Sequence, residues 1–271
     1  MSSNPPEILP LGVRKFPIAR FKGELFQDGS DFVAQEVPVA LIFNGISHAV
    51  MLATPSDLED FALGFGLTEG LLISKAELFG VEQKRVEQGI EVHLEVSSAC
   101  EWRLKERRRT LAGRTGCGLC GTDSLFQVRQ KLNPVSALAI KKQSILKAQS
   151  ELQNQQTLQL LTGATHAAAW IDISGEIVRI REDVGRHNAL DKLIGSLINI
   201  QPQTSAGFIC VTSRASFEMV QKAIYIGSPL LAAVSAPTDF AIEIAKSNNL
   251  ALAGFIRGNG LVAYTFPERF K

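Results

Sequence analysis

Hydrophobic and polar residues alternate along two stretches in the first third of the chain, Phe32 to Phe43 and Ile46 to Ala53. The pair Asn44-Gly45, which favours a two-residue hairpin turn, separates the two stretches. Alternation with a period of two residues is typical of a half-buried strand. The pattern therefore predicts a β-hairpin here, and the same alternation over 90–96 predicts a further strand.

A helical pattern begins directly after this hairpin. Thr54 is a favoured N-cap residue, Pro55 suits the first helical position, and apolar residues then recur at helical spacing until Gly70. The chain before the hairpin differs, because prolines recur through residues 1–19. We expect a helix that starts at Thr54 and ends near Gly70, preceded at the N-terminus by an irregular arm over 1–19.

The segment from Ser97 to Gly121 shows no periodicity of either kind. A connection of this length without secondary structure is uncommon in a compact domain and is usually functional or disordered. We therefore expect a mobile loop over 97–121.

The second half of the chain alternates strands and helices. Some apolar residues recur at helical spacing, short apolar runs predict buried strands, and a pair of alternating stretches predicts a second hairpin. Strands that alternate with helices indicate a mixed α/β sheet with helical crossovers. In chain order the expected elements are a helix at 152–161, a hairpin over 167–181, a helix at 190–198, and strands near 206–212, 230–235 and 250–256, with helices starting near Ser216 and Thr238 between the strands.

These elements predict an α/β protein in two parts. The N-terminal part is expected to be a smaller α+β domain over 20–135, which follows the arm and includes the loop. The C-terminal part, over 136–271, is expected to be a three-layer α/β domain with a mixed sheet and a cofactor site. A chain of 271 residues is long enough for this arrangement.

Composition narrows the range of partners. The chain has 28 basic and 27 acidic residues, so its net charge of +1 gives no reason to expect a nucleic-acid partner. No apolar stretch is long enough to span a membrane, and the N-terminus lacks the apolar core of a signal peptide. The cysteine count of 4 is too low for a disulfide framework at this length. We expect a cytoplasmic protein that binds neither nucleic acid nor a membrane.

Two of the cysteines, Cys117 and Cys120, stand three positions apart in the glycine-rich string Thr115 to Gly121. A basic run between Arg103 and Arg114 precedes them, and nearby positive charge stabilises the thiolate, which is the reactive form of cysteine. A Cys-x-x-Cys pair can serve as a redox dithiol, as half of a zinc site or as a sulfur carrier. The pair alone does not decide between these roles.

Residues with hydroxyl groups, arginines or glycines follow the last three predicted strands. Ligands of open α/β sheets bind at the carboxyl ends of the strands, where helix N-termini offer unpaired N–H groups. Arg214 and Arg257 favour an anionic or phosphate-bearing ligand, whereas Ser216 and Thr238 could simply be N-caps. The candidate ligand-binding residues are Ser213, Arg214, Ser216, Ser235 and Thr238, together with Phe255, Ile256, Arg257, Gly258, Asn259 and Gly260 after the last strand.

Arg186 and His187 belong to a polar block where the second hairpin leads into the next helix. Glu182 and Asp183 could orient either side chain, which would extend the site beside the strand ends. The alternative is a capped helix with a surface ion network, since a lone histidine is usually a hydrogen-bonded side chain without chemistry.

The candidate residues fall within distinctive motifs: Thr115 to Gly121, Glu182 to Ala189, Ser213 to Glu218 and Ser235 to Thr238. In this order they resemble the formate dehydrogenase accessory sulfurtransferase (FdhD) family, and the resemblance covers most of the chain from Thr54 onward. Members of that family take sulfane sulfur from a cysteine desulfurase. They pass it to the molybdenum cofactor, in its bis(molybdopterin guanine dinucleotide) form, which formate dehydrogenase then receives.

The resemblance implies roles for particular residues. It implies a persulfide on Cys117, with Cys120 as a second thiol that relays or releases sulfur. It implies that the molybdenum cofactor binds as cargo near the stretch Phe255 to Gly260, with no tightly bound metal of the protein's own. It also implies a homodimer and a C-terminal fold similar to that of cytidine deaminases. Ser213 departs from the family pattern, which has glycine before Arg214.

Two other functions would require only some of these candidate residues. A carrier that only holds the molybdenum cofactor needs the site at the strand ends but no reactive sulfur. A dithiol redox protein needs only Cys117 and Cys120.

Zinc chemistry is a further alternative. His93-Leu94-Glu95 followed by Cys117 and Cys120 imitates the residue order of zinc deaminases. However, the deaminase His and Glu lie at a helix start, whereas this pair lies on a predicted strand. A structural zinc site would instead need Cys100, Cys210 or a histidine as additional ligands.

Overall fold

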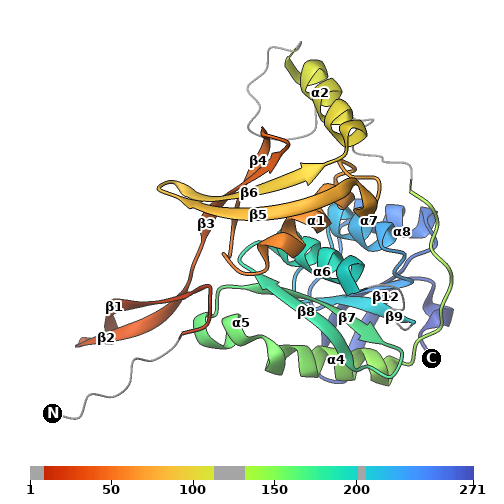
Figure 1. Ribbon diagram of the computed structural model, residues 1–271. Helices are drawn as coiled ribbons and strands as arrows, with labels where there is room; N and C mark the ends of the chain where they lie inside the picture. Colours follow the sequence, from red (N-terminus) through yellow and green to blue (C-terminus); the bar gives the residue numbers. More distant parts are fainter. Residues whose placement is uncertain (1–8, 113–131, 201–205) are drawn as a thin grey trace.

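The computed structural model describes residues 9–112, 132–200 and 206–271 (Figure 1). Three separate sheets organise it: a two-stranded ribbon, a four-stranded sheet and a six-stranded sheet. Figure 1 shows helices α1 (Leu58–Thr68) and α6 (Arg186–Ile200) between the two larger sheets. The described part of the chain contains no helix that is both long and apolar enough to cross a membrane.

The N-terminal ribbon consists of β1 (Val13–Lys22) and β2 (Leu25–Ala34), which pair antiparallel over their full length and extend away from the rest of the molecule (Figure 1). The expectation of an irregular arm over 1–19 is therefore wrong from Val13 onward. Pro17 lies within β1. A proline is tolerated there because both strands of a two-stranded sheet are edge strands.

The four-stranded sheet has the order β4-β3-β6-β5. Its strands are β3 (Val37–Phe43), β4 (Ile46–Ala53), β5 (Leu78–Val86) and β6 (Gly89–Val96), with a short 3-10 turn η1 (Lys75–Glu77) before β5. Asn44 and Gly45 have φ angles of 44° and 77°, as a tight hairpin turn requires. The predicted hairpin and the predicted strand over 90–96 are confirmed, although the hairpin begins at Val37 and Phe32 belongs to β2.

Helix α1 begins at Leu58, later than expected, and Thr54 is not its N-cap. Asp57 precedes the helix with a φ of 54° and makes no side-chain cap. The Thr54 hydroxyl instead donates to Asp183 at 2.9 Å, in the C-terminal half of the chain. A tertiary hydrogen bond has therefore replaced the local cap that the sequence favours.

Helix α2 (Ser98–Ala112) occupies the first part of the segment that we expected to be a loop. Its sequence contains many charged helix formers, and Cys100 and Leu104 are its buried apolar side chains among those described. Two buried positions one turn apart are too few to give a visible apolar stripe. The expectation of a loop is therefore wrong over 98–112, and the Cys-x-x-Cys motif at 117–120 lies outside the described residues.

The six-stranded sheet has the order β12-β11-β10-β9-β7-β8. Strands β9, β10 and β11 run parallel, whereas β7, β8 and β12 pair antiparallel with their neighbours. The expected strands and hairpin are confirmed, and β12 is an additional edge strand. The strands are β7 (His166–Asp172), β8 (Ile177–Asp183), β9 (Gly207–Val211), β10 (Leu230–Ala233), β11 (Ala251–Arg257) and β12 (Gly260–Thr265).

Helices cover both faces of this sheet. Ala168 and Trp170 of β7 face a core shared with α6, α7 and α8, whereas Ala167, Ala169 and Ile171 face a second core shared with α4. The C-terminal half is thus a three-layer α/β structure, as predicted. The helices are α4 (Lys142–Gln155), α5 (Thr157–Thr162), α7 (Phe217–Tyr225) and α8 (Asp239–Ser247), besides α6 and the 3-10 turn η2 (Pro267–Arg269).

Helices α1 and α6 cross with their backbones in close approach. A Cβ atom added to Gly64 would lie 1.8 Å from the Asp191 carbonyl oxygen, and one added to Gly195 would lie 1.9 Å from the Asp60 carbonyl oxygen. Any side chain at either glycine would therefore push the helices apart. This contact joins the four-stranded sheet to the six-stranded sheet.

Candidate functional site

The loops that follow β9 and β10 run side by side. The Ala215 N–H donates to the Ala236 carbonyl at 3.2 Å, and the Thr238 N–H donates to the Ala215 carbonyl at 3.1 Å. These bonds hold one predicted group of residues, Ser213, Arg214 and Ser216, beside the other, Ser235 and Thr238. The carboxyl ends of β9 and β10 thus form one edge, as the sequence predicts.

Helices α6 and α7 begin next to each other at this edge. His187 Nε2 lies 2.7 Å from Glu218 Oε2 and 3.5 Å from the Ser216 hydroxyl. The hydrogen bond from His187 lowers the pKa of Glu218. Sequence reasoning named His187 and Ser216 but did not single out Glu218, although it stands in the Ser213 to Glu218 motif.

The capping interpretation is correct for one of the two hydroxyls. The Thr238 hydroxyl accepts from the Ala241 N–H at 3.3 Å and so caps α8. Ser216 stands at the N-cap position of α7 but makes no such bond. Its hydroxyl faces His187 instead and is available for other contacts.

The stretch Phe255 to Gly260 forms the end of β11, a tight turn and the start of β12. The Phe255 N–H donates to the Ser235 carbonyl at 3.2 Å, which joins this hairpin to the loop after β10. Phe255 and Arg257 are exposed, whereas Ile256 is buried in the core between α4 and the sheet. The predicted Gly258-Asn259 segment is the turn, in which Gly258 has a φ of 55°.

Arg186 begins α6 beside the same edge. Its Nε is buried and has no hydrogen-bond acceptor among the residues that the structure describes. His166, at the start of β7, pairs across the strands with Asp183 at the end of β8. The edge thus carries a cluster of basic groups that includes His166, which sequence reasoning missed because a histidine at a strand start has no distinctive pattern.

Burial and the positive charge of Arg186 lower the pKa of His166, and His187 acts in the same direction, while Asp183 opposes them. The unfolded chain then binds this proton more readily than the folded chain. Folding stability is therefore expected to fall as the pH drops below 6.5 and through the lowered pKa.

An NMR titration of the ring protons checks this expectation, with the His166 resonance assigned from its absence in His166→Gln. The expected midpoint lies below that of a model histidine peptide, and the variant should lose less stability than wild type below pH 6.5. A midpoint at or above the peptide value would contradict the environment described here.

The two cysteines outside the Cys-x-x-Cys motif, Cys100 and Cys210, are buried in separate hydrophobic cores. Cys100 is 0% exposed in the core of the four-stranded sheet, where its Sγ donates to the Leu71 carbonyl at 3.2 Å. Cys210 is 0% exposed in the core under α4, and burial raises its pKa to about 12. Neither thiol is therefore exposed for attack on a sulfur donor.

His93 and Glu95 lie on β6, in the four-stranded sheet, as predicted. His93 Nε2 lies 2.9 Å from Glu91 Oε2 on the same strand. The pair is thus neither at a helix start nor at the edge where the candidate residues gather. The arrangement gives no support to a deaminase-like His-x-Glu site.

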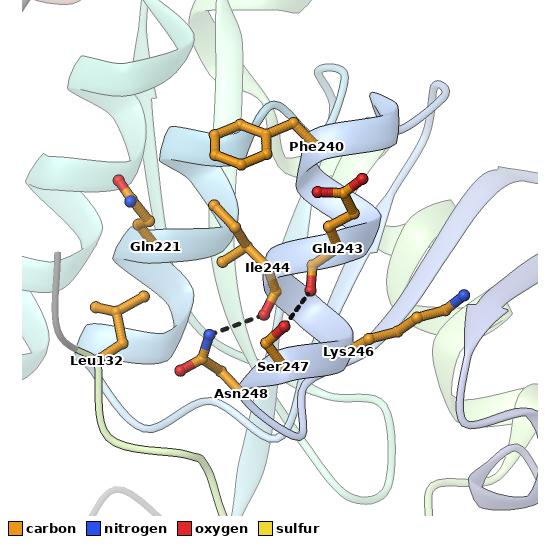
Figure 2. Close-up of a pocket in the computed structure, with 8 residues that line it drawn as sticks. All are labelled: Leu132, Gln221, Phe240, Glu243, Ile244, Lys246, Ser247 and Asn248. Carbon is orange, nitrogen blue, oxygen red and sulfur yellow. Dashed lines mark hydrogen bonds between the residues drawn. The ribbon is translucent and has the colours of Figure 1, made fainter. Parts of the chain in front are cut away.

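A hollow of about 490 Å³ lies between α7 and α8, next to Leu132 (Figure 2). Asn248 Nδ2 donates to the Ile244 carbonyl and the Ser247 hydroxyl donates to the Glu243 carbonyl, both at 2.9 Å. These polar groups are already paired with their own helix. The hollow contains none of the predicted site residues.

Comparison with known proteins agrees with the motifs. The FdhD/NarQ family model matches residues 34–271. The chain is 57% identical over 243 residues to the sulfur carrier protein FdhD of Variovorax paradoxus (strain S110), covering 89% of this chain and 87% of the relative. It is 52% identical over 255 residues to that of Bordetella bronchiseptica, covering 93% and 92%.

The fold also matches a solved structure. A structure described as a formate dehydrogenase accessory protein from Desulfotalea psychrophila aligns with a TM-score of 0.74 at 21% identity, over 97% of this chain and 100% of that one. The chain thus has the mixed α/β fold of that structure. The chain belongs to the FdhD/NarQ family.

Proposed function

We propose that this protein is a sulfur carrier in the maturation of formate dehydrogenase. It accepts sulfane sulfur from a cysteine desulfurase as a persulfide on Cys117 and passes it to the molybdenum cofactor, in the bis(molybdopterin guanine dinucleotide) form. The names of its relatives, with up to 57% identity, support the sulfur-carrying role. The formate dehydrogenase accessory protein with the same fold supports the choice of recipient.

The observation that carries this proposal is the burial of the other two thiols. Since Cys100 and Cys210 are both 0% exposed, the reactive sulfur is assigned to the Cys-x-x-Cys pair. That pair follows α2, whose sequence is rich in arginine and lysine. Positive charge nearby favours the thiolate of Cys117.

The proposed chemistry takes two steps. The Cys117 thiolate attacks the outer sulfur of the donor persulfide, a new S–S bond forms, and the cysteine of the desulfurase leaves as a thiolate. The Cys120 thiolate then attacks the inner sulfur of the Cys117 persulfide and releases hydrosulfide to the cofactor. The product is a Cys117–Cys120 disulfide, which a dithiol reductant must reduce before the next cycle.

The candidate residues at the strand ends are proposed to hold the cargo. Arg214 and Arg257 supply cations for its phosphates, and the hydroxyls of Ser213, Ser216, Ser235 and Thr238 supply hydrogen bonds. Arg186 carries a buried donor that has no acceptor in residues 9–112, 132–200 and 206–271, which supports an anionic ligand at this edge. His187 would approach the same ligand through Ser216.

The proposal includes a homodimer and a C-terminal fold related to cytidine deaminases. The α/β/α layering of the six-stranded sheet supports the second of these. The exposed apolar residues of the ribbon, including Phe21 and Phe26, offer a surface for a second subunit.

The proposal is tested by incubating the purified protein with a cysteine desulfurase and cysteine, followed by peptide mass spectrometry without reductant. The expected result is a gain of one sulfur atom on the peptide that contains Cys117. Sulfur on no peptide would favour a cofactor carrier without reactive sulfur. A Cys117–Cys120 disulfide that cycles with a dithiol reductant and takes up no sulfur would favour the redox alternative.

A further inference from the structure

Helix α2 projects beyond the four-stranded sheet and is anchored by its first turns (Figure 1). Cys100 enters the core of that sheet. Arg103 Nη2 donates to the Leu71 carbonyl at 3.2 Å and to Glu77 Oε2 at 2.5 Å. Glu77 also accepts from the Ile73 N–H at 2.8 Å. The root of α2 is therefore fixed against the segment that leads into β5.

The opposite face of α2 points to solvent. Its exposed side chains follow one another at the helical spacing of three and four residues, and they are Ser98, Ala99, Trp102 and Lys105. Trp102 is 64% exposed, whereas the other tryptophan of the chain, Trp170, is buried. Ser98 and Ala99 lie one turn before Trp102 and are too small to cover its indole ring. Accessible tryptophans of this kind are enriched among the hot spots of protein interfaces.

Two further large apolar side chains are exposed near the root of α2. They are Ile73 and Phe79, which lie on either side of Glu77 in the sequence. Glu77 forms the ion pair with Arg103, the direct neighbour of Trp102. Three exposed apolar side chains, Ile73, Phe79 and Trp102, are thus set around one ion pair, and we call them the α2 patch. Exposed apolar side chains that gather at one place are typical of an interaction site.

The charge of α2 indicates which partner fits. The helix has five basic and two acidic residues, although the whole chain has a net charge of only +1. This excess of positive charge favours a partner surface that carries carboxylates. A second copy of the chain would bring an equally basic helix to the same place, so the charges would repel. A helix that binds in a membrane surface needs a broad apolar face, whereas the outward face of α2 combines Trp102 with Ser98 and Lys105.

The covalent structure of the chain indicates what such a partner does. Helix α2 ends at Ala112, and Cys117 follows five residues later. Five residues span at most about 18 Å. Transfer of sulfane sulfur requires direct contact between two sulfur atoms. A protein that gives sulfur to Cys117 must therefore bring its own cysteine to within that distance of the end of α2.

We infer that the α2 patch docks the sulfur donor, a protein that presents a surface rich in carboxylates and an apolar recess for Trp102 beside its persulfide cysteine. The inference rests on the proposed function, because the cysteine desulfurase of that proposal is the protein that has to meet Cys117. Docking raises the effective concentration of the donor persulfide at Cys117 and leaves the chemistry of the transfer unchanged.

The inference is tested by following sulfur transfer to the full chain from two donors. A purified cysteine desulfurase with cysteine has to dock, whereas glutathione persulfide is too small to require the α2 patch. Trp102→Ala is expected to raise the desulfurase concentration that gives the half-maximal rate at least about thirtyfold, which is the effect of losing a hot-spot side chain. The maximal rate and the rate with glutathione persulfide are expected to equal those of wild type, because Trp102 takes no part in the S–S exchange.

Leu160→Ala is the matched control for the loss of an exposed apolar side chain. Leu160 is 65% exposed on α5, so both variants should keep the wild-type melting temperature. Lys105→Glu and Lys246→Glu make the same change of charge at exposed positions of α2 and α8. Lys105→Glu is expected to raise the half-maximal desulfurase concentration about tenfold, because it places a negative charge against the carboxylates of the donor. Lys246→Glu is expected to leave it unchanged.

Equal half-maximal concentrations for Trp102→Ala and Leu160→Ala would overturn the inference, and a persulfide on Cys117 in both would leave the proposed function intact. The inference would also be wrong if Trp102→Ala lost the same rate with both donors, since the variant would then perturb Cys117 itself. Binding of wild type but not of Trp102→Ala to phosphatidylglycerol vesicles would assign the α2 patch to a membrane instead. Wild type that takes up sulfur from neither donor would refute the proposed function.

Discussion

Cells that carry Cys117→Ala in place of the wild-type chain are expected to show formate dehydrogenase activity no higher than cells without this protein. The physical reason is that alanine cannot form the S–S bond on which the proposed transfer depends. Cys100 and Cys210 cannot substitute, because each is 0% exposed in a separate core. The measurement is formate-dependent dye reduction in extracts with matched amounts of the variant and wild-type chains.

Cys210→Ala is the matched control. It also removes one thiol, and the raised pKa of about 12 makes Cys210 unreactive at neutral pH. It should retain sulfur loading and formate dehydrogenase activity. Wild-type activity in the Cys117→Ala cells would leave only the role of a cofactor carrier. Complete loss of formate dehydrogenase activity with a folded Cys210→Ala chain would instead identify Cys210 as the reactive cysteine.

Most of the fold could be predicted because its patterns are local. Asn44-Gly45 specifies its turn through two positive φ angles, and the apolar runs of β9, β10 and β11 are those of strands buried on both faces. Helix α2 could not be predicted in the same way. Its buried contacts at Cys100 and Leu104 are too sparse to give a pattern against its charged residues.

The candidate site also contains some features that the sequence predicts and others that it does not. The proximity of the strand-end loops could be predicted, because the topology places the carboxyl ends of parallel strands at one edge of the sheet. His166 could not be predicted, since it is significant only through its surroundings, which combine burial with nearby cations. Such properties arise from tertiary packing, which a linear pattern does not contain.

The position of Thr54 illustrates how long-range bonds override local preference. Lys192 Nζ donates to the Thr54 hydroxyl at 2.7 Å and lies 2.6 Å from the Asp183 carboxylate. The Lys192 and Asp183 side chains are each 0% exposed. Asp183 also accepts from the Thr54, Gly185 and Asn188 nitrogens at 2.8 to 3.0 Å. A fully bonded ion pair therefore ties the end of β4 to the strand β8 that precedes α6.

Lys192→Met is expected to lower the free energy of unfolding by about 3–5 kcal/mol, because it leaves the Asp183 carboxylate buried without its cation. Urea unfolding followed by circular dichroism measures the loss. The double variant Lys192→Met with Asp183→Asn removes the unpaired charge as well, so it should be more stable than Lys192→Met alone.

Lys147→Met is the control for the lysine side chain itself. Lys147 also lies close to carboxylates, those of Glu151 and Glu176, but its side chain is 42% exposed, so its removal should have little effect. If Lys192→Met were as stable as Lys147→Met, the buried pair would not be what ties Thr54 to the C-terminal sheet. The junction would then depend on the close packing of α1 against α6, where Gly64 and Gly195 leave room for no side chain.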